Sequence, residues 1–504
     1  MNSVRVTHYA SRFPFMSIYP ANWSKIYHPP CKHIHMNLTF APCFAQLDHM
    51  LKNEPVSKGY KVILTGVLFL VLPTFLSGQP AHDTLPSKVT LSQCITYALA
   101  HQALVQQSQL DEDITRRNIR IALSGWYPQL EFDAGLEDFL QAPLSSYPNV
   151  LNPASPLTYP STSNYVSPGI FSASQTLYSN SLLFAARTAR QLKNQASENT
   201  ENTRINTTVD VTKAFYDVLL TEEQLNVLDE DIVRLQRNYQ DAWNLYKDGL
   251  TDKIDYQRTE ISLSNAQAEK RTAQEALKAK YSVLKHTMGV VPGKQLTVSY
   301  DSSRYESEIL YDTSKNLDYS KRIEYKQMQT SLTLQNTEIS YYRWSFLPTL
   351  SAYYDYEPLF QNDQFADLYN KNYPTQVIGL KLTIPIFQGL NRLENLSRAK
   401  IQYKRLELGM EYLKSGISSE YTQALAAYLS NLNELRIAKN NIAVAKDIFN
   451  TVKFQYDKGI KAYLEVIVSE TDLRTAELNY LDILFQVLSS KMDLEKALGD
   501  IKTN

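Results

Sequence analysis

The sequence predicts a mixed α/β chain built from long coiled-coil helical hairpins and four β-strands. Three observations predict it. Residues 210 positions apart match over roughly eighty residues, so the chain contains an internal duplication. Each half carries an apolar residue at every seventh position over five or six consecutive heptads, which indicates coiled-coil packing. Before each heptad stretch, directly after a proline, the period changes to two residues, which indicates strands.

The composition excludes several classes of function. The chain has 504 residues, with 51 Lys and Arg against 52 Asp and Glu, so its net charge of −1 gives no reason to expect nucleic acid as the main partner. Its three cysteines cannot form a disulfide scaffold or a four-thiolate zinc site. The 15 glycines are few for a fold with many short loops and favour long regular elements.

An apolar run near the amino end predicts export. Three lysines precede residues 62–76, and small residues follow them, as in a secretory signal peptide over 50–79. A membrane anchor is the alternative, but the run is shorter than the roughly twenty residues of a spanning helix, and Pro73 interrupts it. Because signals begin near the terminus, we expect translation to start at Met50 and residues 1–49 to be a non-native upstream extension.

The duplication divides the rest of the chain into two repeats. We expect a first repeat over 89–290 and a second over 316–500, each with a helix, two strands and a long helical hairpin. A linker over 291–315 joins them and can supply a short strand. After residue 79 the sequence contains no segment that resembles a transmembrane helix.

Each repeat predicts one very long helix and a return helix. Residues 182–247 and 391–457 keep the heptad period without a proline, and the first would be close to 100 Å long at about 1.5 Å per residue. Gly249 and Gly459 follow them, and glycine is the residue type that turns a chain out of a helix. A heptad pattern then resumes, so each half forms an antiparallel hairpin of helices.

Two strands are expected before each long helix. Apolar and polar residues alternate after Pro128 and Pro348, and return strands follow after loops rich in Ser, Pro, Asn and Asp. Four strands cannot close a barrel, so either they form a soluble sheet or several chains complete one barrel together; three copies would give twelve strands. The predicted strands are 130–136, 166–178, 350–356 and 377–384, and the predicted loops are 141–163 and 361–373.

This order of elements resembles the TolC outer-membrane efflux family. The marks are a Tyr-x-x-Gly motif at each hairpin turn, a Pro-x-Leu sequence where strands begin, and the run Ile384–Gly389. The resemblance implies a homotrimer, with a twelve-stranded barrel in the outer membrane of a Gram-negative bacterium and a twelve-helix tunnel in the periplasm. It also implies two partners, a periplasmic adaptor (membrane fusion protein) and an inner-membrane pump. The chain would then be the passive exit duct of a tripartite efflux or type I secretion system.

The resemblance further implies a gate at the periplasmic tip, held by a tyrosine, a basic residue and acidic residues. Gly249 and Gly459 mark the tip turns where the adaptor would make contact. Val468 stands where the best-known member of the family has another acidic residue, so this sequence departs from a double ring of carboxylates. Carried onto this sequence, the gate residues are Asp255, Tyr456, Lys461 and Glu465.

No catalytic, cofactor or metal site is expected. His101 and His286 are isolated on predicted helices, and the sequence lacks the common nucleophile, phosphate-loop and zinc motifs. The chain is therefore not expected to be an enzyme, and energy for transport must come from another subunit. The alternative function is a periplasmic coiled-coil adaptor without a channel, although an adaptor would be expected to carry one hairpin and a compact β-rich domain.

Overall fold

The computed structural model describes residues 86, 88–148, 151, 154, 157–300 and 305–503. The predicted extension over 1–49 and the signal peptide over 50–79 lie outside these residues. Among the described helices, none combines the length and the apolar composition that crossing a membrane requires.

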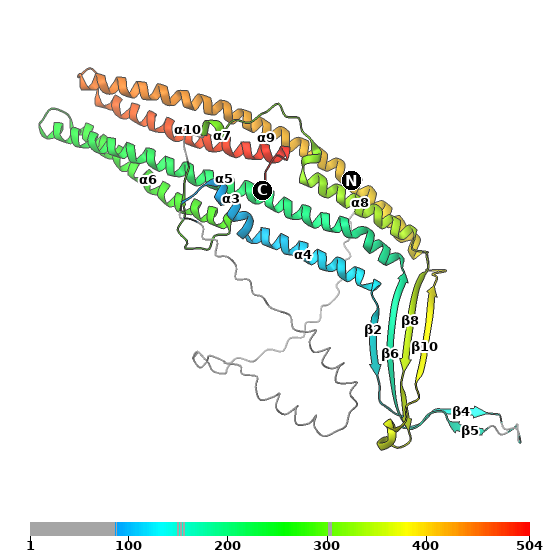
Figure 1. Cartoon of the computed structure of the whole chain (residues 1–504). Helices are drawn as coiled ribbons and strands as arrows, with labels where there is room; N and C mark the ends of the chain where they lie inside the picture. Colours follow the sequence, from blue (N-terminus) through cyan, green and yellow to red (C-terminus); the bar gives the residue numbers. More distant parts are fainter. Residues whose placement is uncertain are drawn as a thin grey trace, which may run out of the picture. The chain divides into compact units, whose positions relative to one another are not determined.

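Four long helices form two antiparallel hairpins (Figure 1). Helix α5 (Asn180–Lys247) returns as α6 (Lys253–Met288), and α9 (Asn391–Asp457) returns as α10 (Tyr463–Leu498). The long helices were predicted from the heptad period, and the structure confirms both. Helix α9 has the predicted bounds, whereas α5 begins two residues earlier than predicted.

Shorter helices lie beside the long ones. Helix α3 (Leu91–His101) is separated from α4 (Ala103–Leu123) by Gln102, whose extended backbone ends the first helix. Helix α8 (Ile323–Arg343) is 21 residues long, as α4 is, and it begins 220 positions later in the chain. Helix α5 contacts both α4 and α8, and α8 also contacts α9 (Figure 1). Short helical segments are η2 (Ser124–Trp126), α7 (Tyr305–Glu308) and η4 (Tyr319–Lys321).

The hairpins are held together by the predicted heptad seams. Seam residues Val211, Val218, Leu228 and Leu235 of α5 are less than a tenth exposed. The main apolar cluster joins α3, α5, α6, α9 and α10 around Phe215, which is fully buried. Burying a side chain of this size stabilises the fold by roughly 1.5–3 kcal/mol. The packing therefore makes the two repeats one body of helices.

Four antiparallel strands form the central part of the sheet. Their order is β10-β8-β6-β2, so within the described residues β2 and β10 are its edges. The longest, β6, pairs with β2 on one side and β8 on the other. The strands are β2 (Gln129–Ala134), β6 (Tyr165–Tyr178), β8 (Thr349–Glu357) and β10 (Thr375–Thr383).

The expected count of four strands is too low. Strands β3 (Glu137–Asp138) and β9 (Leu359–Asn362) continue β2 and β8 along the first half of β6. Gly135 and Pro358 interrupt these runs. The backbone still pairs at the interruptions, because Gly135 N–H donates to the Pro168 carbonyl at 2.9 Å and Gly169 N–H donates to the Pro358 carbonyl at 2.8 Å.

The two segments predicted as loops also contain regular structure. In 141–163, β4 (Leu144–Tyr147) pairs with β5 (Leu157–Pro160), and in 361–373 there is a 3₁₀ helix, η5 (Phe365–Asn370). The linker over 291–315 supplies β7 (Thr297–Val298), which pairs in parallel with β1 (Lys88–Val89).

The strand register gives the sheet two different faces, because successive side chains alternate between faces and paired residues share one. One face is mainly apolar and the other is mainly polar. The apolar face carries Leu130, Phe132, Phe171, Ala173, Leu350, Tyr354, Ile378, Leu380 and Leu382. The polar face carries Gln129, Glu131, Asp133, Ser172, Ser174, Ser351, Asp355, Glu357 and Lys381.

Candidate gate at the helical tips

The two hairpin turns have the same backbone geometry. Gly249 has φ of 73° and Gly459 has φ of 74°, in the left-handed region that favours glycine. The N–H of Gly459 donates to the Tyr456 carbonyl at 2.8 Å, and the N–H of Ile460 donates to the Gln455 carbonyl at 2.9 Å. The equivalent bonds in the first turn measure 3.0 and 2.9 Å. Each pair satisfies the last carbonyl groups of a long helix and fixes the direction in which the chain turns back.

Asp255 lies in the first turn of α6. Its Oδ2 accepts a hydrogen bond from Thr251 Oγ1 at 2.7 Å. A carboxylate at this position is also stabilised by the positive end of the helix dipole. The preceding turn therefore holds Asp255 at the tip of the first hairpin.

Tyr456 lies at the end of α9, opposite this carboxylate. Its ring is 5.2 Å from the ring of Tyr463. Burial raises the pKa of Tyr456, and the negative charges of Asp255, Asp457 and Asp241 raise it further. Tyr456 is thus a neutral hydroxyl donor at physiological pH, within electrostatic reach of Asp255 on the other hairpin.

Lys461 and Glu465 form a local ion pair. Lys461 Nζ is 2.5 Å from Glu465 Oε2, one helical turn away, and both side chains are more than a third exposed. An exposed pair of this kind contributes only about 0.3–0.5 kcal/mol. Of the four residues predicted for the gate, Lys461 and Glu465 are therefore in contact within the second hairpin, whereas Asp255 acts on Tyr456 of the other hairpin through its charge. Val468, which replaces an acidic residue of the family pattern, is 52% exposed.

An ionic cluster that sequence reasoning missed lies further along the hairpins. Asp231 of α5 is fully buried, and its carboxylate contacts Arg234 at 3.1 Å and Arg474 of α10 at 3.0 Å. Glu470 of α10 is 2% exposed and accepts a hydrogen bond from Asn238 Nδ2 at 2.9 Å. These side chains connect α5 of the first hairpin directly to α10 of the second.

Glu470 is incompletely compensated in this cluster. Its Oε1 faces Arg234 Nε at 3.4 Å, and neither atom has a hydrogen-bond partner, so their attraction is electrostatic. Burial and the nearby charge of Asp231 raise the pKa of Glu470 to about 7, although Arg234 and Asn238 oppose this shift. Glu470 therefore carries a proton over part of the physiological pH range.

The sequence does contain a signal for this cluster. Asp231 is three residues after Leu228 and four before Leu235, so it shares a helix face with two buried seam residues. Glu470 is four residues after Val466 and three before Leu473, so it also shares a helix face with two buried residues. Carboxylates on the seam faces of two helices predict buried acids that need basic partners, and Arg234 and Arg474 are those partners here.

The described residues contain no group of three or more His, Cys, Asp or Glu side chains arranged to hold a metal ion.

Comparisons with known proteins agree on one family. The model of the family described as "Outer membrane efflux protein" matches residues 94–290 and 322–500, which is more than half of the chain. The chain is 22% identical over 356 residues to outer membrane protein TolC of Vibrio cholerae serotype O1, covering 68% of this chain and 78% of that protein. It is 19% identical over 418 residues to the proteases secretion protein PrtF of Dickeya chrysanthemi, covering 80% and 87%.

Solved structures share the fold. CusC matches with a TM-score of 0.65 at 18% identity, over 81% of this chain and 91% of that chain. The CmeC outer membrane channel of Campylobacter jejuni matches with a TM-score of 0.63 at 16% identity, over 81% and 85%. The open state of the MtrE outer membrane channel of Neisseria gonorrhoeae also has a TM-score of 0.63 at 16% identity, over 81% and 88%.

Proposed function

The chain belongs to the outer membrane efflux protein family, and we propose that three copies of it form the passive exit duct of a tripartite efflux or type I secretion system. The duct would lie in the outer membrane of a Gram-negative bacterium and extend into the periplasm. An inner-membrane pump would supply the energy, and a periplasmic adaptor would contact the hairpin turns at Gly249 and Gly459.

The two-faced sheet is the observation that carries this proposal. On its apolar face Ile378 is 84% exposed, Leu130 is 73% exposed and Leu380 is 69% exposed. A soluble sheet buries such a face against other elements, whereas a membrane strand presents it to lipid. The opposite face carries Glu131, Asp355 and other polar residues, as a water-filled interior requires.

The sheet edges support the number of copies. Strand edges cannot face lipid because their N–H and C=O groups would be unpaired, so β2 and β10 need partners. Pairing β10 of one copy with β2 of the next satisfies both edges. Three copies with four strand runs each then close a twelve-stranded barrel, which is wide enough to leave a channel.

The tips supply the gate in this assembly. In a trimer, each residue at the tip becomes a ring of three, and carboxylate rings at a constriction favour cations. Asp255 and Tyr456 would hold neighbouring hairpins together in the closed state, and the Lys461–Glu465 pair would fix the start of α10. A charge-assisted hydrogen bond from the Tyr456 hydroxyl to Asp255 is the interaction that opening would break.

The test is fractionation followed by electrical recording. We expect the protein in outer membranes, with the mass of a trimer after detergent extraction, and stable single-channel currents after reconstitution into planar lipid bilayers. A monomer that is soluble without detergent and gives no current would overturn the proposal. That result would favour the alternative, a periplasmic coiled-coil adaptor without a channel.

A further inference from the structure

A small β-hairpin is separate from the main sheet, the one in which β10, β8, β6 and β2 are neighbours. Among the described residues, β4 and β5 pair with each other and with no other strand. The hairpin leaves the end of the main sheet that is far from the long helices, and it runs across the direction of the sheet strands (Figure 1). A lone two-stranded hairpin is marginally stable in water, so it needs a further surface to pack against.

The register makes the two faces of this hairpin unequal. Tyr147 is paired with Leu157 and Tyr159 is paired with Ser145, so the three large side chains lie on one face. Tyr147 is 58% exposed and Tyr159 is 53% exposed. We call this side of the hairpin the tyrosine face. The opposite face is smaller and more polar and carries Leu144, Ser146, Thr158 and Pro160.

The sequence around the hairpin carries no charge. Between Asp138 and Arg187 there is no Asp, Glu, Lys, Arg or His, although charged residues make up 20% of the chain. Leu140, near the start of this run, is 97% exposed. A partner that recognises charge finds nothing to pair with here, whereas exposed leucine and tyrosine suit the boundary between lipid and water. The composition therefore favours a lipid surface over a charged macromolecule.

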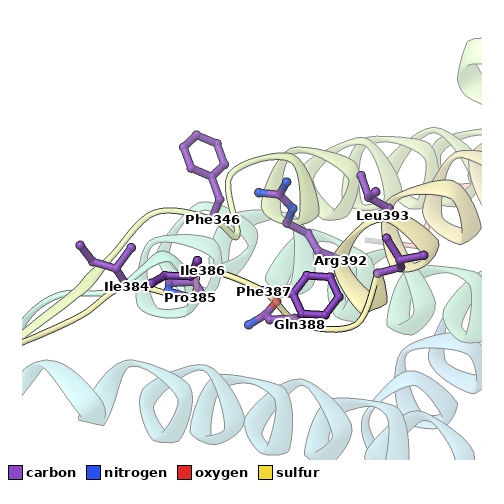
Figure 2. Close-up of a pocket in the computed structure, with 9 residues that line it drawn as sticks. Phe346, Ile384, Pro385, Ile386, Phe387, Gln388, Arg392 and Leu393 are labelled. Carbon is purple, nitrogen blue, oxygen red and sulfur yellow. The ribbon is translucent and has the colours of Figure 1, made fainter.

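The helix end of the main sheet marks one lipid boundary in the proposed channel. A groove of about 650 Å³ lies where β10 leads into α9, and Phe346, Ile386 and Phe387 line it (Figure 2). Phe387 is 80% exposed, and the guanidinium of Arg392 lies 5.4 Å from the ring centre of Phe346. Exposed aromatic and basic side chains are typical of the level where a membrane meets water.

Strand length places the hairpin at the opposite boundary. Trp126, the counterpart of Phe346, precedes Pro128, and counting about ten residues from Pro128, the span of a membrane strand, reaches Asp138. Glu137 and Asp138 are successive residues of β3, so their side chains point to opposite faces. One of the two carboxylates therefore lies on the outer side of the sheet, where lipid must end.

The backbone fixes the direction and the depth of the hairpin. At its base, the N–H of Phe139 donates to the Asn164 carbonyl at 2.7 Å, and the N–H of Ser161 donates to the Pro143 carbonyl at 2.7 Å. The outer edges of β4 and β5 keep N–H and C=O groups that hydrocarbon cannot satisfy, whereas water and lipid headgroups can. The hairpin therefore suits the boundary region and not the interior of the bilayer.

We propose that the tyrosine face of the β4–β5 hairpin rests on the outer leaflet of the membrane, between the acyl chains and the headgroups. The apolar face of the main sheet and the tyrosine face then form one continuous lipid contact, which fixes the depth of the barrel in the membrane. This inference rests on the proposed function, because it requires the main sheet to span a membrane.

Fluorescence quenching in proteoliposomes tests the contact in the full chain. In a background with Cys31→Ser, Cys43→Ser and Cys94→Ala, an environment-sensitive fluorophore is attached to Tyr159→Cys or to its neighbour Thr158→Cys on the opposite face. Phosphatidylcholine with a nitroxide near the headgroup end of its acyl chain should quench the probe at 159 at least about twice as strongly as the probe at 158. Iodide in the water should show the reverse order.

A charge substitution gives an independent measurement. Leu157→Glu puts a carboxylate on the tyrosine face, so nitroxide quenching of the probe at 159 should fall by at least about half. Ser146→Glu adds the same charge to the opposite face and is the matched control, which should leave the quenching unchanged. Both variants should remain trimers with the single-channel conductance of the parent, because neither residue lies in the tip or on the polar face of the main sheet.

The other outcomes separate this inference from the proposed function. A conducting trimer in which iodide quenches both probes equally would overturn the lipid contact and leave the channel standing. A conducting trimer in which neither quencher reaches the probe at 159 would also overturn it, and would indicate that protein, such as the hairpin of a neighbouring copy, covers the tyrosine face. A soluble monomer without currents would overturn both proposals.

Discussion

At the scale of single residues, Glu470 is the group with the clearest energetic consequence. It is buried between α5 and α10, and its pKa is raised to about 7 from 4.5. A carboxyl whose pKa is higher in the folded state destabilises that state when it is ionised. As the pH rises from about 4.5 to about 7, the unfolded chain releases this proton and the folded chain keeps it. The free energy of unfolding therefore falls over this window, by on the order of 3 kcal/mol.

The substitution Glu470→Gln should abolish this dependence. The amide imitates the protonated carboxyl and cannot ionise, so the variant should be more stable than the parent at pH 8 and equal to it near pH 4.5. Thermal unfolding measured across this range checks the prediction. The control is Glu260→Gln, which alters the exposed repeat counterpart of Glu470 on α6 and should keep the parental pH profile. A Glu470→Gln variant that is less stable than the parent at pH 8 would mean that the ionised cluster is net stabilising.

The positions of the candidate gate residues and of the ionic cluster were predictable to different degrees. The family resemblance located Asp255, Tyr456, Lys461 and Glu465, because turn motifs fix their positions in the sequence. It could not say that Lys461, in the turn before α10, pairs with Glu465 in the first turn of that helix. The contact of Asp231 with Arg474 joins residues 243 positions apart, and it depends on how α5 docks on α10. A heptad period determines which face of a helix is buried, but it does not determine the relative register of two hairpins.

At the scale of elements, the two tip glycines show how a local backbone requirement ends a long helix. An added Cβ at Gly459 would meet no atom within 4 Å, so space is not limiting there. The positive φ is limiting, because an L-residue in this conformation costs roughly 1–2 kcal/mol. Gly459→Ala should therefore weaken the turn by about that amount. Amide hydrogen exchange at Ile460, whose N–H bonds to the Gln455 carbonyl, should become roughly five to thirty times faster.

Gly416 provides a control in which alanine should have the opposite effect on stability. It lies inside α9 with open space around it and without a positive φ. Alanine at this position restricts the unfolded chain and favours the helix, so Gly416→Ala should stabilise the protein by about 0.4–1 kcal/mol. Unchanged exchange at the tip of Gly459→Ala would show that the turn tolerates a non-glycine residue without loss.

Long elements were predictable and short ones were not. The bounds of α9 follow from an uninterrupted heptad period, which many residues repeat. The strands β4 and β5 have four residues each, and a segment rich in Ser, Pro and Asn carries too little alternation to reveal them. At the interruption, the Pro358 carbonyl accepts a hydrogen bond from the Gly169 N–H of another strand. This bond depends on the register between the two strands.

At the scale of the whole molecule, the duplication explains why some helices and strands pack against neighbours on both sides and others on one side only. Helix α5 has a helix from each repeat on its two sides, α4 and α8. Helix α9 has α8 on one side, and its other side carries exposed leucine and isoleucine residues. The same relation holds in the sheet, where β6 is paired on both sides and β10 is an edge. The elements in the middle of this arrangement have neighbours on both sides, whereas those at its two ends leave apolar faces or strand edges without a neighbour. Further copies are required to bury these ends.

The closed state of such an assembly should depend on contacts at its tips. We expect Asp255→Ala combined with Tyr456→Phe to favour the open channel. The two substitutions remove a carboxylate from the first hairpin and a hydroxyl from the second. The hydrogen bond that we propose between these two groups in the closed trimer would contribute about 1 kcal/mol in each chain, so its loss in three copies should shift the closed–open equilibrium by about 3 kcal/mol, or roughly a hundredfold. Single-channel recording in planar bilayers should show a higher conductance or a longer open time.

The first hairpin offers a matched control for this double variant. Tyr246 is the repeat counterpart of Tyr456, but its ring packs 4.8 Å from Tyr256 within its own hairpin. Asp248→Ala with Tyr246→Phe removes the same two chemical groups from a tip without breaking a contact between hairpins, so its currents should match those of the parent. If both double variants conduct like the parent, the closed state is held elsewhere, and the buried cluster of Asp231 and Glu470 becomes the next contact between the hairpins to disrupt.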